Sequence, residues 1–221
     1  MNITNRKVTE YLDGLYRPLT PQLEQMRREA EAEGIPVILR DTERFLAVML
    51  TVIKPSRILE IGTATGYSSS CFAEICGEDT EIVTLESDSE MCRRAGENIR
   101  KLGYGERIRV CQGDAQETMQ ELSPTFDFVF IDAAKSHYRS FFDGALKLCR
   151  KGSVLICDNV LMKAKTVSEE YDPKKKYRTS IRRMRDFLQY ITALDRVETC
   201  VFPAGDGISV SVVKPDAGAA E

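Results

Sequence analysis

The chain has 221 residues, of which 43% are hydrophobic and 29% are charged, and its formal net charge is −3. This length suits a single domain with a substantial core, and the small net charge argues against a protein that binds polyanions through its overall charge. The sequence contains no run of 18 apolar residues and no apolar signal segment near its start, so we expect neither a membrane span nor secretion. Seven cysteines without a C-x-x-C pair, beside a single histidine, disfavour a zinc site and fit reduced thiols in the cytoplasm.

The first part of the chain, residues 1–54, is predicted to be a helical extension or lid. Thr20 before Pro21 is typical of a helix start, and Asp41 or Thr42 is expected to cap a later helix. The predicted helices cover residues 5–16, 21–34 and 43–53.

Residues 55–215 show a different pattern, in which short apolar runs alternate with amphipathic segments. The runs cover residues 57–62, 81–87, 108–114, 126–132 and 153–159. The amphipathic segments between them cover residues 67–76, 89–103, 115–122 and 138–152. This alternation predicts an α/β domain with a parallel sheet and helices on both faces.

The C-terminal part ends this alternation. A helix is predicted over residues 178–194, and two strands follow within residues 197–214. The turn at 203–207, which contains two glycines, predicts that these strands form an antiparallel hairpin at the edge of the sheet.

Polar side chains follow each of the five apolar runs. Ligands of open parallel sheets bind beyond the carboxyl ends of the strands, so these side chains are expected to share one crevice. They are Glu60, Glu86, Asp114, Asp132, Asp158 and Asn159.

The first run leads into a glycine turn, from Gly62 to Gly66. The turn lacks the G-x-G-x-x-G spacing of a nicotinamide site, and Glu60 before it would repel a pyrophosphate. An acid there suits a ligand with an ammonium and a sulfonium group, which is S-adenosylmethionine (SAM), and Glu86 stands where an acid would bind the ribose hydroxyls. The alternative is that the turn is only structural.

Asp132, Asp158 and Asn159 form a second group at the ends of neighbouring strands. Their hard oxygen atoms suit Mg²⁺, which keeps open positions for water and substrate. We expect Asp158 to face a wet crevice. The alternative is that Asp132 caps a helix while Asp158 and Asn159 form a turn.

A basic stretch at residues 174–185 carries seven positive charges and no negative charge, so the rest of the chain carries −10. Positive charge there would neutralise phosphates of a nucleic acid. The alternative is a solvated helix face. The residues expected to contact RNA are Lys163, Lys165, Lys174, Lys175, Lys176 and Arg178.

Five motifs occur in order and resemble the cation-dependent class I O-methyltransferases of the catechol and caffeoyl-CoA type. They are EIGTATGYSS, TLESD, GDA, FIDAAKSHY and CDNVL, and the resemblance covers nearly the whole chain. Within that family, IPVI, FIDAAKSHY, DNVL and PAGDGISVS are similar to segments of the bacterial tRNA 5-hydroxyuridine methyltransferases. The chain departs from the usual pattern at Met162-Lys163-Ala164-Lys165, where a glycine is usual.

The resemblance implies a single methyltransferase domain over residues 1–221. Its fold would be Rossmann-like, with a mostly parallel seven-stranded sheet, a C-terminal antiparallel hairpin, N-terminal helices and a SAM-binding core at 55–215. The resemblance also implies that Asp132, Asp158 and Asn159 hold magnesium, with Lys135 as a base or electrostatic partner. The residues that would contact SAM are Ile38, Ser68, Glu86, Asp114, Ala115 and Asp132, to which the glycine-turn argument adds Glu60 and Gly62.

The expected reaction is magnesium-dependent methyl transfer from SAM to a hydroxyl oxygen. The favoured acceptor is 5-hydroxyuridine at the wobble position of a tRNA anticodon, which would become 5-methoxyuridine. The alternative is a small catechol or phenylpropanoid-type acceptor. A binder of nucleic acid without catalysis would explain the basic stretch but not the three oxygen side chains of the predicted metal site. The family resemblance further suggests a homodimer.

Overall fold

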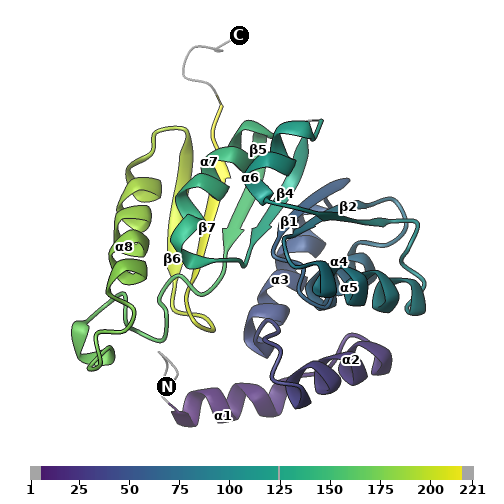
Figure 1. The fold of residues 1–221 in the computed structure, drawn as a ribbon, viewed down its shortest axis with the longest axis horizontal. Helices are drawn as coiled ribbons and strands as arrows, with labels where there is room; N and C mark the ends of the chain where they lie inside the picture. The colour runs from purple at the N-terminus through teal and green to yellow at the C-terminus, as the bar shows by residue number, and fades with distance from the viewer. Residues whose placement is uncertain (1–5, 124, 216–221) are drawn as a thin grey trace.

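The sheet has seven strands in the order β3-β2-β1-β4-β5-β7-β6 in the computed structural model, which describes residues 6–123 and 125–215. Figure 1 shows this order across the molecule, from β6 on the left towards β2 on the right. The bounds are Arg57–Ile61 (β1), Glu81–Glu86 (β2), Ile108–Gln112 (β3), Phe126–Ile131 (β4), Cys149–Cys157 (β5), Val197–Phe202 (β6) and Ile208–Val213 (β7).

The pairing of the strands confirms the predicted fold class. Strands β1 to β5 are parallel to one another, whereas β7 is antiparallel to both β5 and β6. The hairpin of β6 and β7 thus closes one edge of the sheet, as the two glycines of its turn predict. All five parallel strands end at the same edge, where a ligand can be bound.

Eight α-helices lie in the described part of the chain. They are Arg6–Leu15 (α1), Pro21–Ala32 (α2), Arg40–Ile53 (α3), Tyr67–Cys76 (α4), Ser89–Lys101 (α5), Ala115–Glu121 (α6), Tyr138–Lys147 (α7) and Arg178–Ala193 (α8), with 3₁₀ turns at Lys135–His137 (η1) and Glu169–Tyr171 (η2). None of these helices combines the length and hydropathy of a membrane-spanning segment.

The two faces of the sheet carry separate cores, because successive side chains of a strand point to opposite faces. Leu59 and Ile61 of β1 pack in the core that includes α6, α7 and α8. Ile58 packs on the other face, in the core that includes α2, α3, α4 and α5. The sheet is therefore the middle of three layers.

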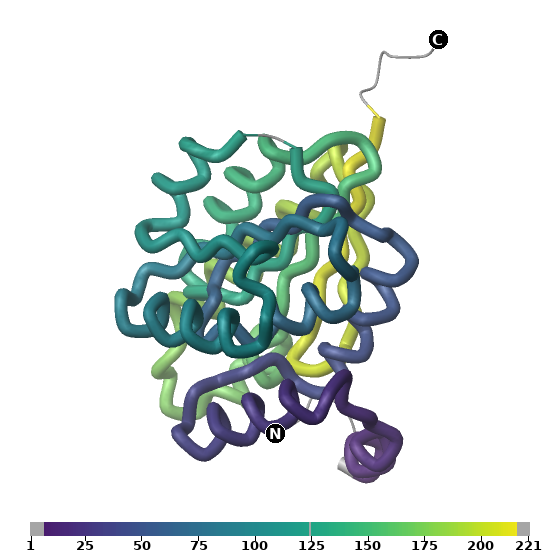
Figure 2. The backbone as a smooth tube through the Cα atoms, turned by 90° about the vertical axis from the view of Figure 1, so that its right-hand side faces the viewer, coloured from purple at the N-terminus to yellow at the C-terminus, as the bar shows by residue number. Residues whose placement is uncertain are grey.

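The N-terminal helices lie across the end of the molecule opposite to the C-terminal end of β7 (Figure 2). Thr20 caps α2 as expected, since its side chain accepts a hydrogen bond from the Leu23 N–H. Leu46 and Leu50 of α3 are fully buried and pack in the second core. The division into a lid over residues 1–54 and a core over 55–215 remains a prediction, and its outermost residues, 1–5, lie outside the described part.

Two expected helix boundaries are wrong. Helix α3 begins at Arg40, so its N-cap residue is Leu39, whose apolar side chain cannot cap it. The Asp41 carboxylate lies within the helix and accepts hydrogen bonds from Thr42 N at 2.9 Å and from Gly205 N at 2.8 Å in the β6–β7 turn. The segment 138–152 is helical only to Lys147. Strand β5 begins at Cys149, which pairs with Phe126 of β4, so pairing with the sheet overrides the helical periodicity there.

Candidate functional site

A cavity of about 1380 Å³ lies at the carboxyl ends of the parallel strands. Its wall is built from the residues that follow β1, β2, β3, β4 and β5, together with the segment before α3. The predicted site residues in this wall are Ile38, Gly62, Ser68, Glu86, Asp114, Ala115, Asp132, Lys135, Asn159 and Lys163. The topology therefore brings most of the predicted cofactor and metal residues to one cavity.

Other predicted site residues lie outside this wall. Glu60 and Asp158 are fully buried, so the expectation that Asp158 faces a wet crevice is wrong. The Asp158 side chain turns inward, where its Oδ1 accepts a hydrogen bond from Asn159 N at 2.7 Å. The basic residues beyond Lys163 do not reach the wall either; these are Lys165, Lys174, Lys175, Lys176 and Arg178.

The turn after β1 requires glycine at its first position. Gly62 has φ +104°, and a Cβ there would lie 2.1 Å from the Asp132 carbonyl oxygen. The backbone of β1 can therefore approach the end of β4 closely only without a side chain. Ala64 also has a positive φ, and its N–H donates to Glu86 Oε2 at 2.9 Å, which ties this turn to the end of β2.

Backbone N–H groups fix the two acids that follow β2 and β3. Glu86 Oε1 accepts hydrogen bonds from Ser87 N and Asp88 N, at 2.8 and 2.9 Å. Asp114 caps α6, since its Oδ1 accepts from Gln116 N and Glu117 N. Both carboxylates also line the cavity, so the protein holds them in place where a ligand would meet them.

Glu60 lies beneath the glycine turn. Thr84 donates to its Oε2 at 2.6 Å, while its Oε1 has no hydrogen-bond partner among the described residues. Burial raises the pKa of Glu60 to about 7, against the opposing effect of the nearby Ser68 and Thr84 hydroxyls, and repulsion from Asp132 adds to the rise. A positive group bound above this carboxyl would favour its ionised form.

Lys135 is the centre of the cluster at the ends of β4 and β5. Its Nζ donates to Asp132 Oδ1 and to Asn159 Oδ1, each at 2.9 Å, and to the Tyr138 hydroxyl at 2.8 Å. The Tyr138 hydroxyl in turn donates to the Asp158 carbonyl oxygen at 2.7 Å. An ammonium group thus lies between side chains that the sequence predicts as metal ligands.

The donor atoms of this cluster fit a hard divalent cation. Asp158 Oδ2 is buried without a hydrogen-bond partner in the described structure, and burial followed by repulsion from Asp132 raises the pKa of Asp158 to about 8. A bound cation would supply the positive charge that stabilises the ionised form of this carboxyl. Nowhere in residues 6–123 and 125–215 do three or more His, Cys, Asp or Glu side chains form a metal-binding group, so the candidate set consists of two carboxylates and one amide.

Two residues of the site were not predicted from the sequence. Tyr138 begins the segment 138–152, for which the sequence predicts only an amphipathic helix. It is buried, and its hydroxyl also accepts the hydrogen bond from Lys135. Asp206 lines the cavity and accepts a hydrogen bond from Lys163 N. The acid in the segment PAGDGISVS is the signal that could have identified it.

The basic stretch meets the loop that carries Lys163. The ammonium groups of Lys165 and Lys176 both lie over the Tyr177 ring, 5.1 and 5.5 Å from its centroid. Arg185 already makes a hydrogen bond within the protein, because its Nε donates to the Thr166 carbonyl oxygen at 2.7 Å. The side chains of residues 174–176, Arg178 and Arg182 are exposed, so a partner can reach them.

Comparison with known proteins identifies similar chains. The O-methyltransferase family model matches residues 17–214. Caffeoyl-CoA O-methyltransferase 2 of Zea mays is 31% identical over 212 residues, which cover 90% of this chain and 79% of the maize protein. The Medicago sativa caffeoyl-CoA O-methyltransferase is 31% identical over 180 residues, which cover 77% of this chain and 72% of the relative.

Solved structures show the same fold. An O-methyltransferase from Bacillus cereus in complex with SAH superposes with a TM-score of 0.81 at 29% identity, over 94% of this chain and 97% of that one. A candidate caffeoyl-CoA O-methyltransferase from Staphylococcus aureus superposes with a TM-score of 0.87 at 27% identity, over 92% and 98% of the two chains.

The raised pKa of Glu60 predicts a pH-dependent stability that can be measured without ligand. The stability associated with Glu60 is fully present below its ordinary pKa of 4.5 and is lost as pH rises through about 7, because the buried acid must then ionise. Glu60→Gln should therefore be more stable than the wild type at pH 8, by up to about 3 kcal/mol. This advantage should shrink towards pH 5 in urea titrations. Gln in place of the exposed Glu78 is the control, and an advantage of Glu60→Gln that is the same at both pH values would contradict the prediction.

Proposed function

The chain belongs to the O-methyltransferase family and is a SAM-dependent O-methyltransferase of the caffeoyl-CoA type, and we propose that it binds its acceptor hydroxyl beside Lys135 with the help of a divalent cation. The observation that carries the proposal is the position of the Lys135 ammonium between Asp132 Oδ1 and Asn159 Oδ1, next to the buried Asp158. Asp132, Asp158 and Asn159 would hold the cation, for which Mg²⁺ is the expected ion.

The residues of the chain have separate tasks in this reaction. Methyl transfer to oxygen is an in-line displacement, and the acceptor hydroxyl must lose its proton. As an ammonium group Lys135 can stabilise the resulting oxyanion, and only as a neutral amine can it accept the proton; its Nζ lies at the cavity wall and is oriented by the Tyr138 hydroxyl. When bound, a divalent cation lowers the pKa of a coordinated hydroxyl and fixes its direction.

The SAM end of the cavity is proposed to lie along β1, β2 and β3. Glu86 and Asp114 are held there by backbone N–H groups, and Gly62 keeps the wall open to a ligand. Glu60 lies beneath this end, separated from the cavity by the glycine turn. Its carboxyl would attract the positive groups of SAM across that turn. Ile38, Ser68 and Ala115 complete the proposed contacts, and all three line the cavity.

The metal proposal predicts the effect of removing one carboxylate. Asp158→Ala should weaken Mn²⁺ binding at least tenfold, measured by electron paramagnetic resonance, and should abolish turnover. The fold should persist, because the substitution removes a buried and poorly compensated acid. Chelator should abolish wild-type activity, and Mg²⁺ should restore it.

Asp195→Ala is the matched control, since Asp195 is an exposed acid beyond the end of α8. It should leave both Mn²⁺ binding and turnover unchanged. Full wild-type activity in excess chelator would contradict the metal proposal without affecting the assignment of SAM.

We propose 5-hydroxyuridine in a tRNA anticodon as the acceptor. The hydroxyl of this base lies beside its O4 carbonyl, so the pair of oxygens resembles that of a catechol. The loop with Lys163 lines the cavity, and Lys165 and Lys176 meet at Tyr177 beside that loop, which gives the rim a positive charge that suits a nucleic-acid backbone. An unpaired anticodon base can leave its stack and enter such a cavity.

A small phenolic or phenylpropanoid-type acceptor is the second candidate. The names of the plant relatives favour it, since they act as caffeoyl-CoA O-methyltransferases. A coenzyme A ester also carries phosphates, which the same lysines could bind. Mass analysis of tRNA nucleosides and of caffeoyl-CoA after incubation with SAM and Mg²⁺ separates the two candidates. The true acceptor should gain a methyl group much faster than the other compound.

The tRNA proposal predicts the behaviour of the basic rim. Replacing Lys174, Lys175 and Lys176 with Gln should raise KM for tRNA about tenfold and should flatten its salt dependence, because each lost phosphate contact lowers the slope by roughly 0.9. KM for SAM should not change, since none of the three side chains lines the cavity.

The matched control replaces three exposed lysines remote from the cavity, Lys101, Lys147 and Lys151. This variant has the same change of charge and should behave as the wild type towards tRNA. Equal KM values and equal salt slopes in the two triple variants would identify the 174–176 segment as a solvated face.

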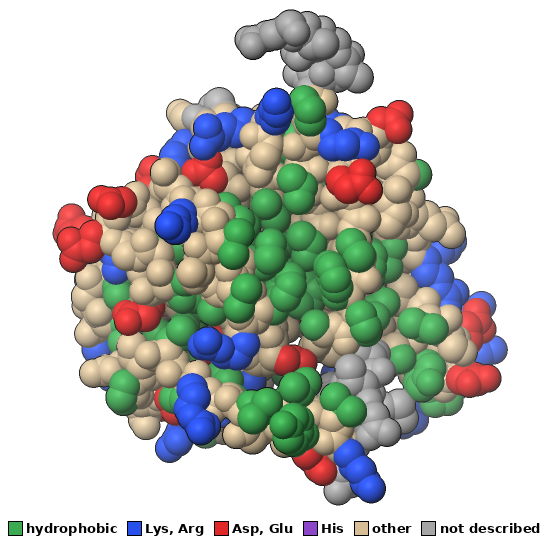
Figure 3. Space-filling model, turned by 180° about the vertical axis from the view of Figure 1, so that it is seen from behind, with side chains coloured by type: hydrophobic (Ala, Val, Ile, Leu, Met, Phe, Trp, Pro, Cys, Tyr) green, Lys and Arg blue, Asp and Glu red, His purple; other side chains and the backbone are tan. Residues whose placement is uncertain are grey.

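The expected homodimer is supported by an apolar surface. Figure 3 shows hydrophobic side chains gathered over the centre of the rear face of the molecule. Apolar side chains of α3, β6 and β7 are exposed in the monomer, namely Val48 (60% exposed), Val52 (74%), Phe202 (40%) and Val212 (38%). A contiguous apolar patch is typical of a protein interface, and we propose that a second copy of the chain covers it.

The dimer proposal predicts a change of mass on substitution. Val52→Asp should convert the dimer to a monomer in light scattering, because burying an unpaired carboxylate in an interface is costly. Val167→Asp, at an exposed valine outside the patch, should leave the mass unchanged. A wild-type chain that is monomeric at micromolar concentration would contradict the proposal.

A further inference from the structure

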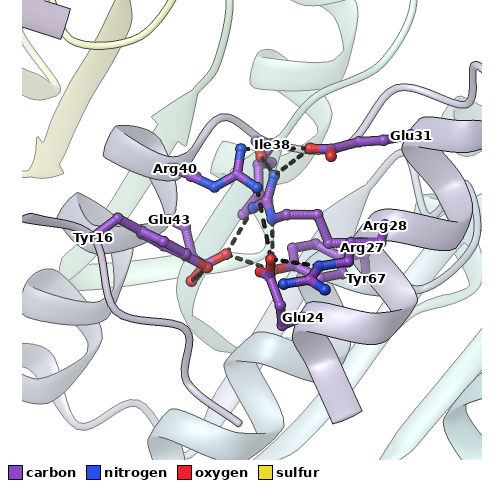
Figure 4. A network of polar contacts seen from close by, with 9 residues as sticks. All are labelled: Tyr16, Glu24, Arg27, Arg28, Glu31, Ile38, Arg40, Glu43 and Tyr67. Atoms are coloured by element: carbon purple, nitrogen blue, oxygen red, sulfur yellow. Dashed lines mark hydrogen bonds and ion pairs between the residues drawn. The ribbon is translucent and has the colours of Figure 1, made fainter. Parts of the chain in front are cut away.

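A buried polar network joins the N-terminal helices to the wall of the cavity (Figure 4). Glu43 of α3 is its centre. Its Oε1 accepts a hydrogen bond from the Tyr16 hydroxyl at 2.8 Å, and its Oε2 accepts from Arg27 Nη2 at 2.7 Å and from the Tyr67 hydroxyl at 2.5 Å. Arg27 and Glu43 are each 1% exposed, so this ion pair is almost fully removed from water.

Arg27 also binds two groups that belong to the cavity wall. Its Nη1 donates to the Ile38 carbonyl oxygen at 2.9 Å, and its Nε donates to the Tyr67 hydroxyl at 3.1 Å. Ile38 precedes α3, whereas Tyr67 begins α4 directly after the glycine turn, and both line the cavity. Arg27 and Glu43 themselves do not line it.

The geometry of a guanidinium makes this arrangement directional. Its donors lie in a fixed plane, and the group stays charged in proteins, so Arg27 sets the distance between the Ile38 backbone and Tyr67. The segment 34–39 has no regular secondary structure, and the buried Ile38 carbonyl would otherwise need another donor. Apolar side chains could fill the same volume, but they would not fix this carbonyl.

We propose that Arg27 and Glu43 are positioning residues of the SAM site, which set the separation of the Ile38 segment and the start of α4. SAM affinity then depends on two side chains that never touch SAM. The inference rests on SAM binding and is independent of the metal and of the acceptor.

The test uses a single and a double variant to separate the effect of the ion pair on stability from its effect on SAM affinity. Arg27→Met leaves Glu43 buried and unpaired, so it should lower the melting temperature as well as SAM affinity. The double variant Arg27→Met/Glu43→Gln removes both charges and keeps an acceptor for the two tyrosine hydroxyls, so its melting temperature should recover. Its dissociation constant for SAM, measured by calorimetry without metal or acceptor, should stay at least tenfold above the wild-type value.

Two further measurements separate positioning from general stability. At saturating SAM the double variant should keep kcat within about twofold of the wild type, so that the defect appears in KM. Hydrogen exchange of the amides in residues 35–39 should accelerate in the double variant. Arg57→Met is the control, because Arg57 pairs with Glu81 at the opposite end of the strands. It should change neither KM for SAM nor the hydrogen exchange of residues 35–39.

A double variant that regains both its melting temperature and wild-type SAM affinity would overturn the proposal and leave the ion pair a purely structural one. Wild-type protein that does not bind SAM would instead contradict the function itself. The two failures are therefore distinguishable from the first titration.

Discussion

The repulsion between carboxylates at one edge of the sheet is the constraint on which the site depends. Parallel strands end together at this edge, where Glu60 and Glu86 lie in the last residues of β1 and β2, and Asp132 and Asp158 directly follow β4 and β5. Ionised together without compensation, these groups would destabilise the fold.

The chain compensates for this repulsion in three different ways. Glu86 is stabilised by backbone N–H groups, and Asp132 is paired with Lys135. Glu60 and Asp158 are buried, and burial together with repulsion from Asp132 raises the pKa of Glu60 to about 7 and that of Asp158 to about 8. A raised pKa favours the neutral, protonated form of each acid, which removes its share of the repulsion. The two least compensated acids thus lie where a positive ligand would relieve them, which makes this edge suited to a sulfonium, an ammonium or a divalent cation and unsuited to a pyrophosphate.

The sequence predicts those features that depend on local patterns. The strand ends are marked by an apolar run that stops at an acid, and this signal predicted both the sheet and the position of the cavity. The glycine turn was predictable from the two glycines that follow the first apolar run, whereas the overlap of a Cβ at Gly62 with the Asp132 carbonyl is visible only in the structure. An apolar run, the acid at its end and a glycine turn are local features, so the sequence shows them directly.

Features that depend on distant partners could not be predicted in this way. Asp41 is a good helix cap by type, yet its carboxylate binds Gly205, 164 positions away in the chain. The orientation of Asp158 depends on which of its oxygens meets the next backbone N–H, and no spacing rule gives that. The Arg27–Glu43 pair likewise joins two helices whose sequences show only ordinary surface charges.

The floor and the rim of the cavity are built from different kinds of structure. Lys135, Asp132 and Asn159 are fixed by strand ends and by mutual hydrogen bonds, so their geometry can be shared with relatives that are about a third identical. The loop with Lys163 belongs to the rim, and loops can change in charge and length without disturbing the sheet. In the proposed function, the floor accounts for the reaction type and the rim selects the acceptor, and Lys163 is the basic residue that brings positive charge to the cavity wall there.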